Sequence, residues 1–202
     1  MPAMRQARKM YLASGSPRRR ALMSRILRGR FSVCRHRHEE QMTEGLSPRR
    51  LVSRCALSKA RSAAERRTCG IVIGADTIVV DRGRILGKPD GAEDAARMLR
   101  GISGRTVKVL TAVAVVDIAS GAVARGVETT FVTMRRLSRD EIRRYVRTGE
   151  PLDKAGAFGI QGKGAALVEK IRGDYENVVG LPLALLRRLL RRVGVFVRRE
   201  GE

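Results

Sequence analysis

The chain has 202 residues, of which 43% are apolar, and its formal net charge is +22. This length suffices for a domain with a buried core, and the composition is too apolar for a disordered chain. No apolar run approaches the roughly 20 residues that cross a bilayer, and no signal-peptide core follows the charged first residues, so we expect neither a membrane protein nor an exported one.

The first predicted unit is a strand that leads into a helix. Residues 10–13 are apolar, and residues 22–27 have apolar side chains at helical spacing. The turn Ser14-Gly-Ser-Pro joins them, and Arg18 and Arg19 follow it. Unpaired N–H groups at a helix start, the helix dipole and guanidinium forks all favour an anion. We interpret the turn as a polyphosphate cradle. The alternative is an ordinary helix start, because Ser-Pro is common there and the chain is rich in arginine. The P-loop pattern is absent, so the likeness to a phosphate site is physical and does not rest on a motif.

The remaining patterns alternate between strand and helix. A Ser-Pro pair opens the second helix, a capping box opens the fourth, and an amphipathic helix with arginines outside lies near the end of the chain. This order predicts an α/β fold with a mixed sheet in a single domain, residues 1–202, with an N-terminal extension of about residues 1–8. The predicted strands cover residues 10–13, 31–34, 71–80, 106–117 and 126–135, and the predicted helices start near residues 17, 47, 92, 138 and 181.

Asp76 lies inside the apolar run 71–80. A charge in a buried strand is costly unless it is paired or binds a metal. The alternative is an aspartate that caps a turn at a strand end. Because the run continues as Ile78-Val-Val, we favour a functional carboxylate that holds Mg²⁺ or activates a water. The small residues beside Asp76 predict a kink in this strand, and a hairpin turn follows at residues 81–84.

Three further groups extend this set. The glutamates at 39–40 lie in a polar loop, and one of them could supply a second oxygen ligand to a metal. Lys59 and Lys88 are each typical of solvated surface when considered alone. The glycine-rich segment 149–162 contains Gln161, whose amide can both donate to and accept from a nucleobase edge. Glycines let backbone approach a ligand closely, so we expect this segment to face a ligand.

Two properties of the whole chain concern its partners and its compartment. The net charge suggests nucleic-acid binding, but the arginines are spread along the chain, and seven Phe and Tyr with no Trp leave little for base stacking. We therefore favour incidental basicity with nonspecific polyanion affinity over a dedicated nucleic-acid surface. Three cysteines without a C-x-x-C spacing indicate reduced thiols, and we expect a cytoplasmic protein.

Taken together, the motifs resemble the Maf family of nucleotide pyrophosphatases, from Leu12 to about Leu186. Six ordered matches are far more specific than any one of them. They are Leu12-Ala-Ser-Gly-Ser-Pro-Arg-Arg19, Ala56-Leu-Ser-Lys-Ala60, Gly74-Ala-Asp-Thr77 with Leu86-Gly-Lys-Pro89, Gly149-Glu-Pro-Leu-Asp-Lys-Ala-Gly156, Gly159-Ile-Gln-Gly162 and Asn177-Val-Val-Gly-Leu-Pro182.

The resemblance implies a fold, a reaction and a site. The implied fold is an elongated, twisted mixed sheet flanked by helices, with two lobes around a central cleft. The implied reaction splits a nucleoside triphosphate into its monophosphate and pyrophosphate with Mg²⁺ or Mn²⁺, in a homodimer. Gln161 matches the branch that acts on dTTP and UTP, and modified pyrimidine nucleotides are further candidate substrates. By position, phosphate binding falls to Ser14, Arg18, Arg19, Lys59 and Lys88, catalysis to Asp76, and metal binding to Asp76 and Glu40.

Two departures from the family pattern bear on these expectations. Val107 stands where the family often has His, so this position has no predicted chemistry, and Glu39 lengthens the more usual Asp-Glu pair. The phosphate-binding and acidic positions are retained, and we expect an active enzyme. The alternative is a basic nucleotide- or nucleic-acid-binding regulator of cell division that does not turn over its ligand.

Overall fold

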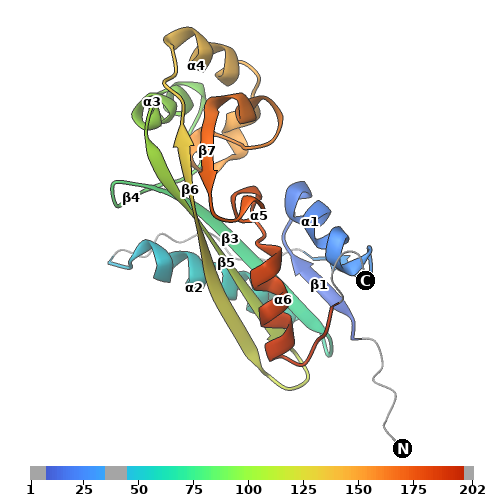
Figure 1. Cartoon of the computed structure of the whole chain (residues 1–202). Coiled ribbons are helices and arrows are strands. Elements are labelled where there is room, and N and C mark those ends of the chain that lie inside the picture. Colours follow the sequence, from blue (N-terminus) through green and yellow to red (C-terminus); the bar gives the residue numbers. More distant parts are fainter. Residues whose placement is uncertain (1–7, 35–44, 198–202) are drawn as a thin grey trace, which may run out of the picture.

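A seven-stranded mixed sheet forms the centre of the computed structural model, which describes residues 8–34 and 45–197 (Figure 1). Its main path runs β2-β1-β3-β5-β6-β7, and β4 pairs with β3. The first three strands of this path are parallel, and all other pairs are antiparallel. The strands are β1 (Met10–Ala13), β2 (Ser32–Val33), β3 (Ile71–Asp81), β4 (Arg84–Leu86), β5 (Thr106–Asp117), β6 (Val123–Met134) and β7 (Val168–Arg172).

Helices cover both faces of this sheet. α2 packs on one face, where its small residues Ala56 and Ala60 meet the even-numbered residues of β3 and β5. α6 packs on the other face, and α3 and α4 lie together at one end of the long strands (Figure 1). The helices are α1 (Pro17–Leu27), α2 (Pro48–Ala64), α3 (Ala92–Ile102), α4 (Arg139–Val146), α5 (Tyr175–Val179) and α6 (Leu183–Arg192), and the 3-10 turns are η1 (Glu150–Asp153), η2 (Ala155–Ala157) and η3 (Gly162–Leu167).

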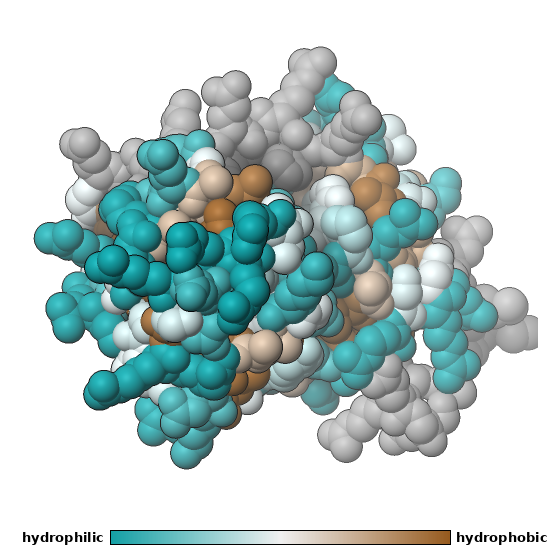
Figure 2. Space-filling model, turned by 90° about the horizontal axis from the view of Figure 1, so that it is seen from above, coloured by the Kyte–Doolittle hydropathy of each residue, from teal (hydrophilic) through white to brown (hydrophobic). Residues whose placement is uncertain are grey.

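Local sequence signals account for most of these elements. Ser138 and Glu141 form the predicted capping box at the start of α4. The leucines of α6 are buried while Arg191 and Arg192 are exposed, as the amphipathic pattern predicts. Hydrophilic residues cover much of the face shown in Figure 2, with smaller apolar patches between them. Among the described residues no helix has the length and apolar character needed to cross a membrane. The predicted α/β class is confirmed.

The kink predicted in β3 is wrong. The strand runs unbroken for 11 residues, and β5 pairs with it through Gly74 and Asp76. Gly74 is small for a different reason, which is the close approach of α2. A Cβ at this position would lie 2.8 Å from the backbone nitrogen of Ala60, and closer still to the carbonyl oxygen of Ala56. The glycine therefore brings helix α2 onto the strand without bending the strand.

Candidate active site

The site is built where β1 ends and β3 continues. β1 pairs with β3 only as far as Ala13, opposite Gly74. Ser14 follows at once and is buried, with its hydroxyl oxygen accepting from the amide of Ser16 at 3.3 Å. Ser16 in turn caps α1. The predicted turn and helix start therefore form, and they place the first turn of α1 beside the free edge of β3.

Lys59 and Asp76 form a buried ion pair on the α2 face of the sheet. The lysine Nζ lies 2.6 Å from Oδ1 of Asp76, and the two residues are 4% and 6% exposed. Pairing of this kind offsets the desolvation of both charges. The absent side chain at Gly74, two residues before Asp76 on the same face, lets α2 bring the lysine this close. The structure thus joins two predicted site residues.

Arg19 reaches the same stretch of β3 from the opposite face. Its Nε donates to the carbonyl of Gly180 at 2.8 Å, and NH1 donates to the carbonyl of Ala75 at 2.9 Å and to the hydroxyl of Ser14 at 3.4 Å. NH2 donates to Oγ1 of Thr77 at 2.9 Å. Successive strand residues point to opposite faces, so Asp76 and Thr77 carry their partners on either side of one strand.

A chain of hydroxyl groups extends this anchorage. Thr111 donates to the carbonyl of Asn177 at 2.8 Å, and its oxygen lies 2.9 Å from that of Thr77. Because a hydroxyl has one proton, and Thr111 gives its proton to Asn177, Thr77 is the donor to Thr111. The oxygen of Thr77 is then left to accept from Arg19. The orientation of the guanidinium is therefore set by a directed series of bonds that ends in α5.

The sequence pattern does not single out these two threonines. Thr111 is fully buried in β5, and Thr77 is only partly exposed in β3. Thr is favoured in strands, so neither residue stood out from its apolar neighbours. The available signal was a polar side chain in a buried run, which is the signal that identified Asp76.

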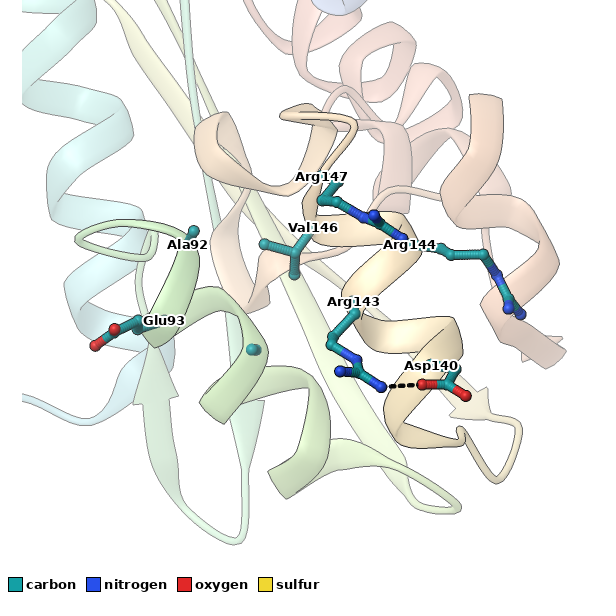
Figure 3. Close-up of a pocket in the computed structure, with 8 residues that line it drawn as sticks. Ala92, Glu93, Asp140, Arg143, Arg144, Val146 and Arg147 are labelled. Carbon is teal, nitrogen blue, oxygen red and sulfur yellow. Dashed lines mark hydrogen bonds and ion pairs between the residues drawn. The ribbon is translucent and has the colours of Figure 1, made fainter.

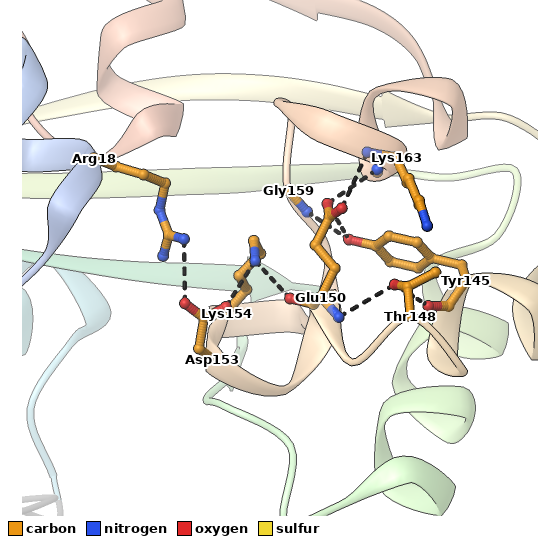
Figure 4. Close-up of polar contacts among 9 residues, drawn as sticks. Arg18, Tyr145, Thr148, Glu150, Asp153, Lys154, Gly159 and Lys163 are labelled. Carbon is orange, nitrogen blue, oxygen red and sulfur yellow. Dashed lines mark hydrogen bonds and ion pairs between the residues drawn. The ribbon is translucent and has the colours of Figure 1, made fainter.

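The remaining predicted residues are Arg18 on the first turn of α1, Lys88 in the loop after β4, and Gln161 just before η3. Figure 4 shows Arg18 beside Asp153 of η1. NH1 of Arg18 lies 3.2 Å from the carboxylate of Asp153 in η1. Lys88 is exposed, and the carbonyl of the preceding residue, Gly87, accepts from the amide of Gly156 at 2.9 Å. Gln161 is exposed in the glycine-rich segment, just before η3. The contacts of Asp153 and Gly156 thus tie both the α1 turn and the Lys88 loop to this segment.

Asp153 remains ionised in this arrangement. Burial raises the pKa of its carboxyl, but the hydrogen bond from Lys154 and the positive charge of Arg18 outweigh burial, so the pKa is lowered from its ordinary value. The lysine Nζ lies 2.7 Å from this carboxylate. The negative charge of Asp153 is thus available to hold Arg18 in place.

Among the described residues, Asp76 is the one predicted carboxylate ligand for a divalent metal at this site. Within residues 8–34 and 45–197, three His, Cys, Asp or Glu side chains do not come together as a metal centre. Oδ1 of Asp76 faces Lys59, and the described residues donate no hydrogen bond to Oδ2. Mg²⁺ commonly takes one or two carboxylates together with substrate phosphates, so Asp76 fits such a site. Glu40, the other predicted ligand, lies outside the described residues.

A separate cavity of about 450 Å³ lies between α3 and α4 (Figure 3). Its lining combines the apolar side chain of Val146 with Arg144 and Arg147 and with the ion pair between Arg143 and Asp140. None of the predicted site residues lines it. The chemistry that the sequence predicts is therefore concentrated around β3, away from this cavity.

Comparisons with known proteins agree with this architecture. The family model described as Maf-like protein matches residues 9–193. A dTTP/UTP pyrophosphatase of Methanosarcina barkeri is 45% identical over 96% of this chain and 98% of its own, and one of Moorella thermoacetica is 52% identical over 94% and 97%. The solved structure of the Staphylococcus aureus Ham1 protein covers 92% of this chain and 99% of its own with a TM-score of 0.50 and 14% identity, which is a likeness of fold alone.

Proposed function

The chain belongs to the Maf family, and on that premise we propose that it hydrolyses dTTP and UTP, each to its monophosphate and pyrophosphate, with the help of a divalent metal. The predicted class, a hydrolase of nucleoside triphosphates, is confirmed, because relatives that match almost the whole chain carry that activity in their names. The observation that carries the finer proposal is the buried Lys59–Asp76 pair, with Arg19 on the other side of the same strand.

The cations at this site suit a triphosphate. Arg18 lies on the first turn of α1, next to Arg19, and Ser14 precedes that helix. Hydrolysis at the α-phosphorus breaks its bond to the bridging oxygen, and negative charge develops on the departing pyrophosphate. Fixed guanidinium and ammonium groups stabilise that charge more than the ground state. In this scheme Lys88 and Lys59 join the arginines as phosphate ligands.

Asp76 is the proposed base. Its carboxylate takes a proton from the attacking water while the water oxygen forms its bond to the α-phosphorus. Nζ of Lys59 lies 2.6 Å from Oδ1, and this ion pair fixes the orientation of the carboxylate. A divalent metal bound by Asp76 and the phosphates, with Glu40 as the further proposed ligand, would supply additional positive charge at the reacting oxygens.

Gln161 is the proposed contact for the pyrimidine. Its amide offers a donor and an acceptor to the O4 and N3–H of uracil or thymine. A site that pairs with such groups rejects bases that lack them, because its polar atoms are then left unpaired. We further propose that the protein is a single domain, forms a homodimer and is located in the cytoplasm. Modified pyrimidine nucleotides are proposed as additional substrates.

The test is pyrophosphate release from a panel of nucleoside triphosphates with Mg²⁺ or Mn²⁺. We expect turnover of dTTP and UTP well above that of ATP and GTP, and a loss of about a hundredfold or more in kcat for Asp76→Asn. Asp140→Asn, an exposed aspartate on α4, is the matched control and retains full activity. Pyrophosphate release that is as fast in Asp76→Asn as in the wild type would contradict the role of Asp76 as base. Binding of nucleotide by metal-loaded protein without any turnover would instead support the regulator alternative.

A further inference from the structure

Glu150, at the start of η1, uses its carboxylate to hold the segment that carries Gln161 (Figure 4). Oε2 accepts from the backbone amide of Lys163 at 3.0 Å, and Oε1 accepts from that of Gly164 at 3.1 Å. Oε1 also accepts from the hydroxyl of Tyr145 at 3.1 Å. Bonds between N–H groups and a charged carboxylate are among the stronger hydrogen bonds in proteins. The carboxylate thus fixes the backbone on one side of Gln161.

Tyr145, on α4, holds the other side. Its hydroxyl oxygen accepts from the amide of Gly159 at 3.2 Å while its proton goes to Glu150. The residue is 4% exposed, and burial, followed by the charge of Glu150, raises the pKa of the phenol. The hydroxyl therefore stays protonated across the physiological range and keeps both bonds. Gly159 and Lys163 lie two residues before and two residues after Gln161. Tyr145 and Glu150 therefore bind the loop backbone at equal distances in sequence on either side of Gln161.

The backbone of the loop lies too close to this pair to carry side chains at two of its glycines. Gly162 has a φ of +65°, and a Cβ there would lie 2.9 Å from Oε2 of Glu150. A Cβ at Gly164 would lie 2.5 Å from the hydroxyl of Tyr145. The carbonyl of Ile160 is bound as well, by the hydroxyl of Tyr175 at 3.3 Å. Gln161 itself remains exposed at the centre of this fixed backbone.

The same short segment also contacts the phosphate side of the site. The carbonyl of Glu150 accepts from Nζ of Lys154 at 2.5 Å, and Lys154 pairs with Asp153. Asp153 holds Arg18. One 3-10 turn therefore connects the residue proposed to bind the base with a residue proposed to bind phosphate, and it keeps them at a set separation.

We propose that Glu150 and Tyr145 are positioning residues for nucleobase selection, which act by fixing the backbone of residues 159–164 around Gln161. This inference rests on the proposed function, in which Gln161 contacts the pyrimidine. Neither residue touches substrate. Their removal loosens Gln161, so it weakens binding of uracil nucleotides while binding of other bases changes little. A merely structural role would weaken all nucleotides alike.

The experiment measures equilibrium binding of α,β-imido UTP and α,β-imido CTP, which cannot be split at the proposed bond. The variants are Tyr145→Phe, Glu150→Gln, Gln161→Ala and the double variant Tyr145→Phe/Gln161→Ala. Glu169→Gln, at an exposed position on β7, is the control for loss of a carboxylate. We expect the UTP-over-CTP preference to fall about tenfold in each single variant and to fall no further in the double variant, because both act on one contact. The control keeps the wild-type preference.

Other outcomes separate this inference from the proposed function. Equal weakening of both analogues in Tyr145→Phe and Glu150→Gln, with the preference unchanged, overturns the positioning role. The positioning role is also overturned if Gln161→Ala lowers the UTP-over-CTP preference as much in the Tyr145→Phe variant as in the wild type. It is overturned as well if the wild-type protein binds the two analogues equally. If the wild type shows the preference but splits neither UTP nor dTTP, the proposed function fails and the positioning role stands.

Discussion

The buried pair between Lys59 and Asp76 links stability to chemistry at the scale of single residues. Both side chains are nearly excluded from water, and their charged atoms lie 2.6 Å apart. Removing one partner of such a pair leaves the other charge buried without its counterion, whereas replacing both removes that penalty. The pair therefore couples the proposed base to the packing of α2.

A double-mutant cycle at these two positions tests that coupling. We expect Lys59→Met to lower the free energy of unfolding by about 3–5 kcal/mol and to abolish turnover. Lys59→Met/Asp76→Asn recovers a large part of the stability but none of the activity. Urea unfolding of the two single variants and the double variant gives the coupling energy. Strictly additive losses would show that the two side chains do not depend on each other.

At the scale of elements, the contact between α2 and β3 determines where Lys59 can reach. Small residues line the contact, with Ala56 and Ala60 on the helix over Gly74 on the strand. Backbone is thus packed against backbone, and a flexible side chain cannot move aside to relieve crowding. An added methyl group at Gly74 must push the helix away from the sheet.

Gly74→Ala should accordingly cost about 1–3 kcal/mol in the free energy of unfolding and should reduce kcat by shifting Lys59. Gly101→Ala is the matched control, since Gly101 is exposed in α3 and an added Cβ meets no atom within 4 Å. It should be neutral or stabilise the protein by up to about 1 kcal/mol. Thermal unfolding and pyrophosphate release of both variants decide the matter. Equal behaviour of the two glycine variants would refute close helix packing as the reason for Gly74.

At the scale of the whole molecule, patterns in the sequence predict the fold class better than the details. Local signals locate several of the helices. The capping box marks the start of α4, and the spacing of the leucines marks α6. The sequence pattern does not predict β7 or α5. α5 has local end signals in the Asp174 cap and the left-handed Gly180, but five residues are too few to show a helical repeat. β7 is equally short and pairs with the distant strand β6. The small residue Gly74 predicts a kink when the strand is considered alone. Its actual role is close packing against α2, which depends on the tertiary fold and leaves no signal in the strand sequence.

The site residues likewise divide into those with a local sequence signal and those whose role depends on tertiary contacts. Asp76 and Arg19 stand out in the sequence, Asp76 through its charge in an apolar run and Arg19 through its place at a helix start. Their partners do not, because Lys59 looks like ordinary helix surface until α2 is packed on β3. Thr111 and Glu150 act through hydrogen bonds to distant residues, and such bonds leave no local pattern in the chain.

The net charge of +22 is a property of the whole molecule and predicts a response to salt. Like charges spread over the surface repel one another and weaken the folded state. Raising NaCl from about 0.05 M to about 0.5 M shortens the screening length, so we expect the thermal midpoint to rise by a few degrees and retention on DNA to vanish. Sequence-selective DNA binding that survives high salt would instead favour a dedicated nucleic-acid surface.

The contacts of Arg8 bear on how the chain could be reconnected. Its guanidinium pairs with Asp117 at the end of β5 and donates to the carbonyl of Val193, just after α6. The two ends of the described chain thus meet at a single side chain. A short peptide could join them without disturbing the sheet, and new ends could open in the exposed turn at Arg82 and Gly83. A circularly permuted chain that is opened in this turn would keep every strand pair of the sheet.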